Sequence, residues 1–297
     1  MTRRRASWRG AALAFGLALW SLEAHAHIPG AASGSGGDNE LGALLPLAIS
    51  AVLLVAGWVR LGRPTAHWPR LAAFVSGWLA LALALLSPID TRGAELFCVH
   101  MVQHEVLMLV AAPLLVLGHP LPVFLWAFPA GARRRIASAC RRNTVQTVWT
   151  ALTRPLSGWL LHAAALWGWH APALFEAALE HPWVHDLQHL TFLLTALVFW
   201  NGLLRTRSTG NDGVSVLYLF TTTVHSGVLG ALITFAAHPW FPHYRATAPA
   251  FGFSALEDQQ LGGLIMWIPG SLVYVGIGLF LLARWVSTSS HRMRSPT

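Results

Sequence analysis

Two pairs of histidines have a spacing that suits metal binding. His100 and His104 form one pair, His185 and His189 form the other, and three residues separate the members of each. Residues i and i+4 lie on the same face of a helix, so the two rings of each pair would project together. Imidazole is the commonest metal ligand, and nitrogen donors suit copper, zinc or iron. The two pairs therefore indicate a transition-metal site, provided that their helices converge.

Carboxylates and thioethers accompany these pairs. Glu105 follows one pair and Asp186 lies within the other, so either could orient a ring nitrogen that does not bind metal. Met101 and Met108 could supply a soft donor to Cu(I). Because metal–nitrogen bonds are only ~2 Å long, Cβ atoms must lie within about 10 Å for the pairs to share one ion. An isolated HxxxH spacing also arises by chance among polar residues at a membrane interface, so convergence of the pairs decides between the two interpretations.

Two further histidines are candidates for the same site. His170 follows Trp169 at the end of a predicted span, on the same side of the membrane as the two pairs. His225 lies alone near the middle of another span. For His225, ligation and a structural hydrogen bond to a neighbouring helix are both open.

The composition is that of a membrane protein. The chain has 297 residues, of which 55% are hydrophobic and 11% are charged, whereas soluble domains average about 25% charged residues. The predicted fold class is all-α, a polytopic helix bundle in a lipid bilayer. The net charge of +8 follows the loops and forms no basic patch with a recognisable motif, so we expect no nucleic-acid partner. The two cysteines form no CxxC motif, and the topology separates them.

Seven apolar stretches of roughly spanning length follow an N-terminal secretory signal. We interpret residues 1–26 as a cleavable signal peptide, with a retained anchor helix as the alternative, 27–41 as a flexible outer segment, 42–285 as the seven-helix membrane domain and 286–297 as a cytoplasmic tail. The predicted spans are 42–60, 71–88, 96–117, 156–174, 187–204, 214–236 and 260–283. The arginine-rich segment between the third and fourth spans predicts a short amphipathic surface helix.

The distribution of arginine between the loops predicts the orientation of the chain in the membrane. Sixteen arginines remain after the signal, and fourteen of them lie in alternate loops, while Arg92 and Arg245 lie in the others. Positive charge favours cytoplasmic loops, so we expect the N-terminus outside and the C-terminus inside. This places the histidine pairs at the outer, non-cytoplasmic face of a multi-pass membrane protein.

The motifs favour a binding role over an enzymatic one. The sequence has no GxSxG, no P-loop and no HExxH, because the His104-Glu105 pair lacks the second histidine. An alternative to a metal-handling protein is a membrane cytochrome that binds haem b through two histidines. A proton or solute conduit is a third possibility, but it requires polar residues across the whole bilayer, and these become sparse in the inner half.

Short blocks occur in a distinctive order from about residue 42 to 285. They are SPID, His100-Met101-Val102-Gln103-His104, Ala112-Pro113-Leu114, Trp169-His170 with Pro172, His185-Asp186-Leu187-Gln188-His189, Phe199-Trp200, and Asp258-Gln259-Gln260-Leu261-Gly262-Gly263 with Met266-Trp267. This order resembles the polytopic membrane CtaG family of cytochrome c oxidase assembly factors. Glu105 departs from the pattern, in which an apolar residue or methionine is expected.

The resemblance implies a multi-pass protein of the inner (plasma) membrane with a role in maturing a haem–copper oxidase, with oxidase subunits as partners and copper as the metal delivered. Carried over residue by residue, the positions that match the family's site are His100, His104, His170, His185, His189 and Asp258. The expectation is thus an assembly factor whose periplasmic site holds copper transiently.

Overall fold

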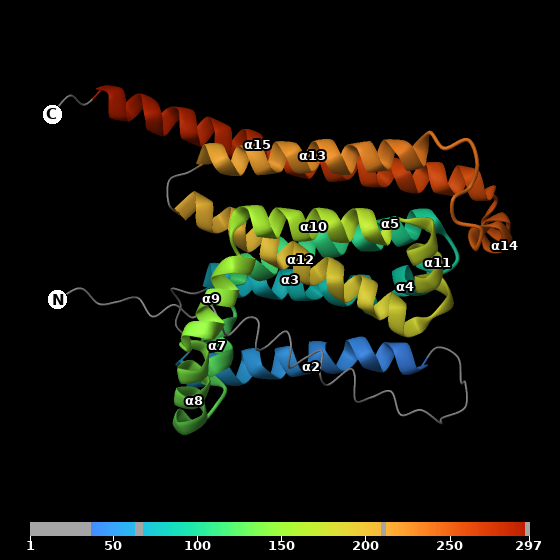
Figure 1. The fold of residues 1–297 in the computed structure, drawn as a ribbon. Coiled ribbons are helices and arrows are strands. Elements are labelled where there is room, and N and C mark those ends of the chain that lie inside the picture. Colours follow the sequence, from blue (N-terminus) through green and yellow to red (C-terminus); the bar gives the residue numbers. More distant parts are fainter. Residues whose placement is uncertain (1–36, 63–67, 209–211, 295–297) are drawn as a thin grey trace.

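The computed structural model describes residues 37–62, 68–208 and 212–294, and every regular element within these ranges is helical (Figure 1). The elements are α2 (Gly37–Arg60), α3 (Trp68–Leu86), α4 (Pro88–Gly93), α5 (Phe97–Glu105), the π-helix η3 (Val106–Ala111), α6 (Ala112–Gly118), α7 (Leu121–Trp126), α8 (Ala130–Cys140), α9 (Asn143–Leu152), α10 (Pro155–Trp169), α11 (Pro172–Glu180), α12 (Pro182–Ser208), α13 (Asp212–Thr234), α14 (Tyr244–Thr247), the 3₁₀ turn η4 (Ala248–Phe251) and α15 (Ala255–Arg294). The all-α class predicted from the sequence is confirmed.

Six helical segments are long and apolar enough to cross a membrane. They are Ala43–Arg60, Trp68–Leu86, Phe97–Gly118, Pro182–Leu204, Asp212–Thr234 and Ala255–Ser287. Each matches one of the seven predicted spans. The remaining predicted span, 156–174, corresponds to α10, which has 15 residues and is therefore about 22 Å long, short of the ~30 Å hydrocarbon layer. The seventh span and the orientation of the chain in the membrane therefore stay predictions.

The prediction for 156–174 is wrong at its C-terminal end. The chain leaves the helix at His170 and Ala171 and starts α11 at Pro172. Proline disfavours the α conformation in the residue before it, and Ala171 accordingly has extended angles, φ −64° and ψ 128°. This break turns the chain at one end of the bundle. The signal peptide 1–26 lies outside the described residues, as does most of the predicted segment 27–41. The predicted tail 286–297 begins inside α15.

The third span changes its helical type where it passes α12. Between α5 and α6 the chain forms π-helix η3, and the Ala112 N–H donates to Leu107 O, five residues back. The next residue, Pro113, has no N–H that could donate to Met108 O, the carbonyl five residues before it. The Trp200 indole Nε1–H of α12 donates to Met108 O instead, at 2.9 Å. The Ala112-Pro113 and Phe199-Trp200 blocks thus belong to one contact between the third span and α12.

Helices α13 and α15 pack side by side along most of their length (Figure 1). Their crossing is close because glycines face each other. A Cβ on Gly263 would lie 2.4 Å from Thr234 Oγ1 and 2.9 Å from Gly230 O. Small residues let helix backbones approach in this way in membrane bundles.

The two ends of the bundle differ in character (Figure 1). Helices α7, α8 and α9 gather at one end, and α4, α11 and α14 lie at the other. The arginine-rich segment forms α8, which confirms the predicted short helix. The Arg133 guanidinium lies over the Trp126 ring, 3.9 Å from its centroid. In the predicted orientation, this end is cytoplasmic.

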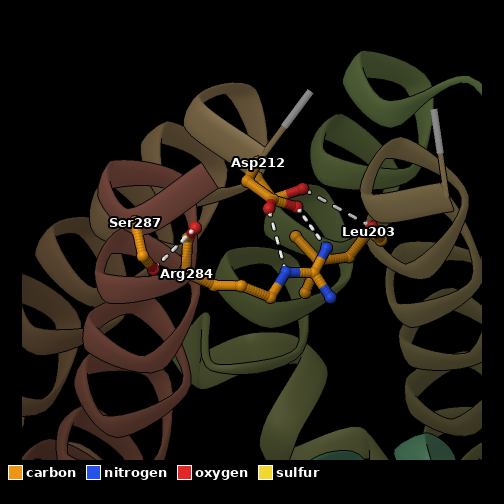
Figure 2. A network of polar contacts seen from close by, with 5 residues as sticks. Leu203, Asp212, Arg284 and Ser287 are labelled. Atoms are coloured by element: carbon orange, nitrogen blue, oxygen red, sulfur yellow. Dashed lines mark hydrogen bonds and ion pairs between the residues drawn. The ribbon is translucent and has the colours of Figure 1, made fainter. Parts of the chain in front are cut away.

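A bidentate ion pair joins α13 to α15 near the end that carries α8 (Figure 2). Arg284 Nε and Nη2 donate to the two oxygens of Asp212 at 3.1 and 3.0 Å. The Asp212 side chain is only 7% exposed, whereas that of Arg284 is 38% exposed. After the predicted signal peptide, Asp212 is the one acidic residue that the predicted topology places on the cytoplasmic side. Its ion pair with Arg284 explains how a carboxylate can be buried there.

Replacing Asp212 by asparagine should destabilise the bundle by about 1–3 kcal/mol, because a charge-assisted pair is lost while the guanidinium stays partly buried. Thermal unfolding in detergent measures this. Glu180→Gln, at an exposed position at the end of α11, is the matched control and should shift stability by less than about 0.5 kcal/mol. Equal melting temperatures for the two variants would contradict the assigned role of the pair.

Candidate metal centre

Five imidazoles from three segments of the chain meet at the end of the bundle near α4, α11 and α14. His100 and His104 come from α5, His170 from the end of α10, and His185 and His189 from α12. Neighbouring ring centroids lie 4.1 to 6.0 Å apart. The structure therefore brings together the two pairs and His170, as the sequence predicted. We call these five residues the histidine cluster.

Three members of the cluster are close enough for a single ion. One ligand nitrogen each from His100, His185 and His189 lies within 4.8 Å of the others. His100 is 1% and His189 is 7% exposed, while His185 is intermediate in exposure. We call these residues the three-histidine subsite. Two of its residues are enclosed, and the third is partly exposed.

Several nitrogens of the cluster have no hydrogen-bond partner within the described part of the chain. They are His100 Nε2, both nitrogens of His104, and His189 Nε2. An unsatisfied buried polar atom costs about 1–3 kcal/mol, so natural proteins rarely keep several in one place. Neutral imidazole nitrogens with free lone pairs are what a transition metal requires. The donor set and its unmet bonding capacity fit a metal ion.

The His170 ring is held by contacts at both of its nitrogens. Its Nδ1 lies 2.7 Å from Leu166 O, and its Nε2 lies 3.4 Å from Met101 Sδ. Met101 is 1% exposed, so its thioether is enclosed with the cluster. Met108 is also buried and belongs to the same apolar core as Met101, but the thioether that contacts His170 is that of Met101.

Tyr244 supports His100, and no motif or spacing in the sequence points to it. Its hydroxyl donates to Gly93 O at 3.0 Å and lies 3.5 Å from His100 Nδ1. Burial, followed by the nearby Asp258 and Glu176 carboxylates, raises the pKa of Tyr244 well above its usual range, so the hydroxyl stays protonated. This contact directs His100 Nε2 toward the cluster. Only the folding of α14 against α4 and α5 brings it there.

The SPID block holds the other side of α5. Ser87 Oγ accepts the Ile89 N–H at 3.1 Å and caps α4, which Pro88 starts. Asp90 Oδ1 accepts a 2.6 Å hydrogen bond from Gln103 Nε2. Asp90 also interacts electrostatically with His185. The block therefore positions the face of α5 that carries the histidines.

Asp258 does not join the histidine cluster, contrary to its assignment as a candidate ligand. Its Oδ2 accepts the Phe97 N–H at 2.7 Å and its Oδ1 accepts the Cys98 N–H at 3.0 Å. These are the first two helical residues of α5, whose N-cap residue Leu96 makes no side-chain cap bond. Free N–H groups and the helix dipole make such a position favourable for a carboxylate. Asp258 acts as a cap supplied by another helix.

The residues after Asp258 dock α15 onto its neighbours. Gln259 Oε1 accepts the Trp240 N–H at 2.5 Å and its Nε2 donates to Ile233 O at 3.2 Å. Gly262 faces the Phe97 ring, where a Cβ would lie 2.3 Å from Cδ1. The whole Asp258–Gly263 block is thus a docking motif that fixes the start of α5.

His225 lies apart from the cluster. Its Nδ1 accepts a 3.4 Å hydrogen bond from Trp167 Nε1, and its ring lies edge-on to Trp159 at 5.4 Å. The structural hydrogen bond that the sequence left open is present. His162, on α10, contacts Thr195 and Tyr274 instead of the cluster.

Glu105 sits one residue beyond His104, in the interior. Its Oε2 is buried without a hydrogen-bond partner among the described residues. Gly270 leaves the space for it, because a Cβ there would lie 3.0 Å from that oxygen. Gln188, between the two histidines of α12, is also fully buried with no partner for either amide atom in the same part of the chain.

The fold and site define a polytopic membrane helix bundle with a buried histidine cluster at one end. Residues 52–288 match the family model described as cytochrome c oxidase caa3 assembly factor (Caa3_CtaG). The chain belongs to this family. No solved structure matches it.

Curated relatives are larger proteins. Uncharacterised proteins of Mycobacterium leprae (strain TN) and Mycobacterium tuberculosis (strain CDC 1551 / Oshkosh) are each 27% identical over 80% of this chain. The matched region is 38% and 37% of their respective lengths, so the chain spans well under half of these relatives.

Gly262→Ala should destabilise the protein, because the new Cβ must displace the Phe97 ring at the start of α5. Gly276→Ala on the same helix is the control, since nothing lies within 4 Å of a Cβ there, and the alanine should be neutral or stabilising by up to about 1 kcal/mol. Thermal unfolding in detergent compares the two. A stability equal to that of Gly276→Ala would show that the contact does not constrain α5.

Proposed function

We propose that this protein is an assembly factor for a haem–copper cytochrome c oxidase in the inner (plasma) membrane, and that the histidine cluster holds copper for delivery to oxidase subunits. The observation that carries the proposal is the meeting of ligand nitrogens from His100, His185 and His189 within 4.8 Å of one another. The family membership supports the oxidase as the partner.

The donor chemistry favours copper over a hard cation. Every donor in the three-histidine subsite is an imidazole nitrogen, which suits copper, zinc or iron and not Mg²⁺ or Ca²⁺. The thioether of Met101 lies beside the cluster and adds a preference for Cu(I). Copper is also the metal that the oxidase requires, so the family and the donors agree.

Delivery requires a site that releases its ion. Closed structural zinc sites have four protein ligands, whereas open sites keep a free position. The three-histidine subsite offers three donors, of which His185 is partly exposed. An incoming ligand from an oxidase subunit can therefore compete at the exposed side. We infer a carrier role and no catalytic one.

The packing of the rings favours an ion over haem b, the alternative ligand. Bis-histidine ligation places the macrocycle between two imidazoles. Here neighbouring rings of the cluster contact each other at centroid distances of 4.1 to 6.0 Å. A haem would have to push apart rings that now pack together.

Removing a ligand of the three-histidine subsite should weaken copper binding at that subsite. We expect His100→Ala and His185→Ala to weaken Cu(I) affinity at least about 100-fold, since losing second-shell contacts alone costs 10–100-fold. Competition with a Cu(I) chelator on the purified, anaerobic protein measures this. His181→Ala is the matched control, because His181 is exposed at the start of α12. An absorption spectrum of the protein as isolated tests for a Soret band.

The cellular readout is oxidase activity in cells that lack the protein. Wild type and His181→Ala should restore activity, while His185→Ala should restore it only with added copper. Copper affinity that is the same in wild type, His100→Ala and His185→Ala would refute the metal role. Restoration by His185→Ala without added copper would refute delivery through this subsite.

A further inference from the structure

The protonation of the His170 ring follows from its partners. Nδ1 lies 2.7 Å from Leu166 O, and a carbonyl oxygen can only accept. Nδ1 must therefore carry the proton. In a neutral imidazole, Nε2 is then an unprotonated lone pair. That lone pair faces inward, toward α5.

The atom that Nε2 faces cannot bond to it. Met101 Sδ lies 3.4 Å away and carries no hydrogen, so two lone pairs confront each other. A second proton on the ring would provide a hydrogen bond only by burying a full positive charge, at a residue that is 3% exposed. A cation between the two atoms resolves the conflict without charging the ring.

The separation of the two atoms suits a shared ion. Metal–nitrogen bonds of about 2.0–2.1 Å and metal–sulfur bonds of about 2.3 Å at a tetrahedral angle place the donors about 3.6 Å apart. The observed distance is 3.4 Å. The two donors therefore need little movement to bind one metal.

His104 supplies the third donor. It lies one turn of α5 beyond His100 and three residues beyond Met101, and its ring centroid is 6.0 Å from that of His170. Both of its nitrogens are buried without a partner in the described part of the chain. His104 is not among the three residues whose ligand nitrogens lie within 4.8 Å of one another. An ion bound by those three residues would therefore leave the His104 nitrogens without a partner.

We propose that Met101, His104 and His170 form a second metal subsite, the thioether subsite, which takes Cu(I) and adjoins the three-histidine subsite. This inference rests on the proposed function, in which the cluster handles copper. The thioether excludes Zn²⁺, whose protein ligands are thiolate, imidazole and carboxylate, and selects a soft monovalent ion.

The two subsites are arranged for transfer by ligand exchange. The His104 ring lies 4.4 Å from that of His100 and 5.4 Å from that of His189, centroid to centroid. An ion can thus gain a bond to His104 before it loses one to the three-histidine subsite. Copper stays Cu(I), all ligands are neutral, and no proton or electron moves. His185 is the exposed end of this path, and Met101 and His170 are the enclosed end.

Cu(I) stoichiometry and X-ray absorption test this arrangement. The intact, purified protein should bind two equivalents of Cu(I), with a sulfur scatterer at about 2.3 Å. Met101→Leu, which preserves side-chain volume, and His170→Ala should each lose one equivalent, and the sulfur signal should vanish in both. Met108→Leu is the matched control and should keep both, because the thioether that contacts His170 is that of Met101. Zn²⁺ should bind as one equivalent in all four proteins.

The outcomes separate this inference from the proposed function. One equivalent of Cu(I) without sulfur scattering, unchanged in Met101→Leu, would overturn the thioether subsite and leave the three-histidine subsite in place. An absence of copper from wild type and every variant would remove both. If His170→Ala does not fold, Met101→Leu alone decides, because it keeps the ring and removes only the sulfur.

Discussion

The carboxylate of Asp258 binds the first two free N–H groups of α5, and the histidine cluster depends on this contact. In a low-dielectric interior, a helix end without partners is costly. Asp258 satisfies this end from a different helix, which fixes α5 against α15 in both position and rotation. His100 lies only two residues after Cys98 on the same helix, so this contact also sets the position of His100. Tyr244 and Gln103 then hold α5 from two further sides. Several parts of the chain thus constrain one short helix.

The sequence predicted the features that depend on local pattern. The i,i+4 spacing predicted the two histidine pairs, and runs of apolar residues predicted seven spans, six of which match helices long and apolar enough to cross a membrane. The rest depends on tertiary contacts that no pattern encodes. Asp258 has the residue type of a metal ligand, and only the fold shows that its oxygens are occupied by backbone N–H groups. Tyr244 starts the short helix α14, 144 residues from His100, without spacing or motif to link them. The end of α10 was missed although Pro172 signalled it, because apolar residues continue beyond the proline.

Burial and donor type divide the cluster into two environments. The three-histidine subsite has one partly exposed residue and only nitrogen donors, whereas Met101, His104 and His170 are each at most 3% exposed and include a sulfur. The polar atoms that lack partners in the described residues concentrate here, at Gln188 and around His104. A membrane protein has little apparent reason to keep such groups unless a ligand completes them.

The π-helical segment Val106–Ala111 sets the phase between the two halves of the third span. A π turn holds more residues than an α turn, and each residue of an α-helix advances the chain by 100°. One additional residue therefore rotates the histidines of α5 by about a quarter turn relative to α6. A homologue that lacked this residue would keep the same hydropathy and the same span, yet its imidazoles would face another neighbour. Hydropathy alone cannot distinguish such a protein from one that retains the cluster, whereas the Trp200–Met108 hydrogen bond marks the rotated form.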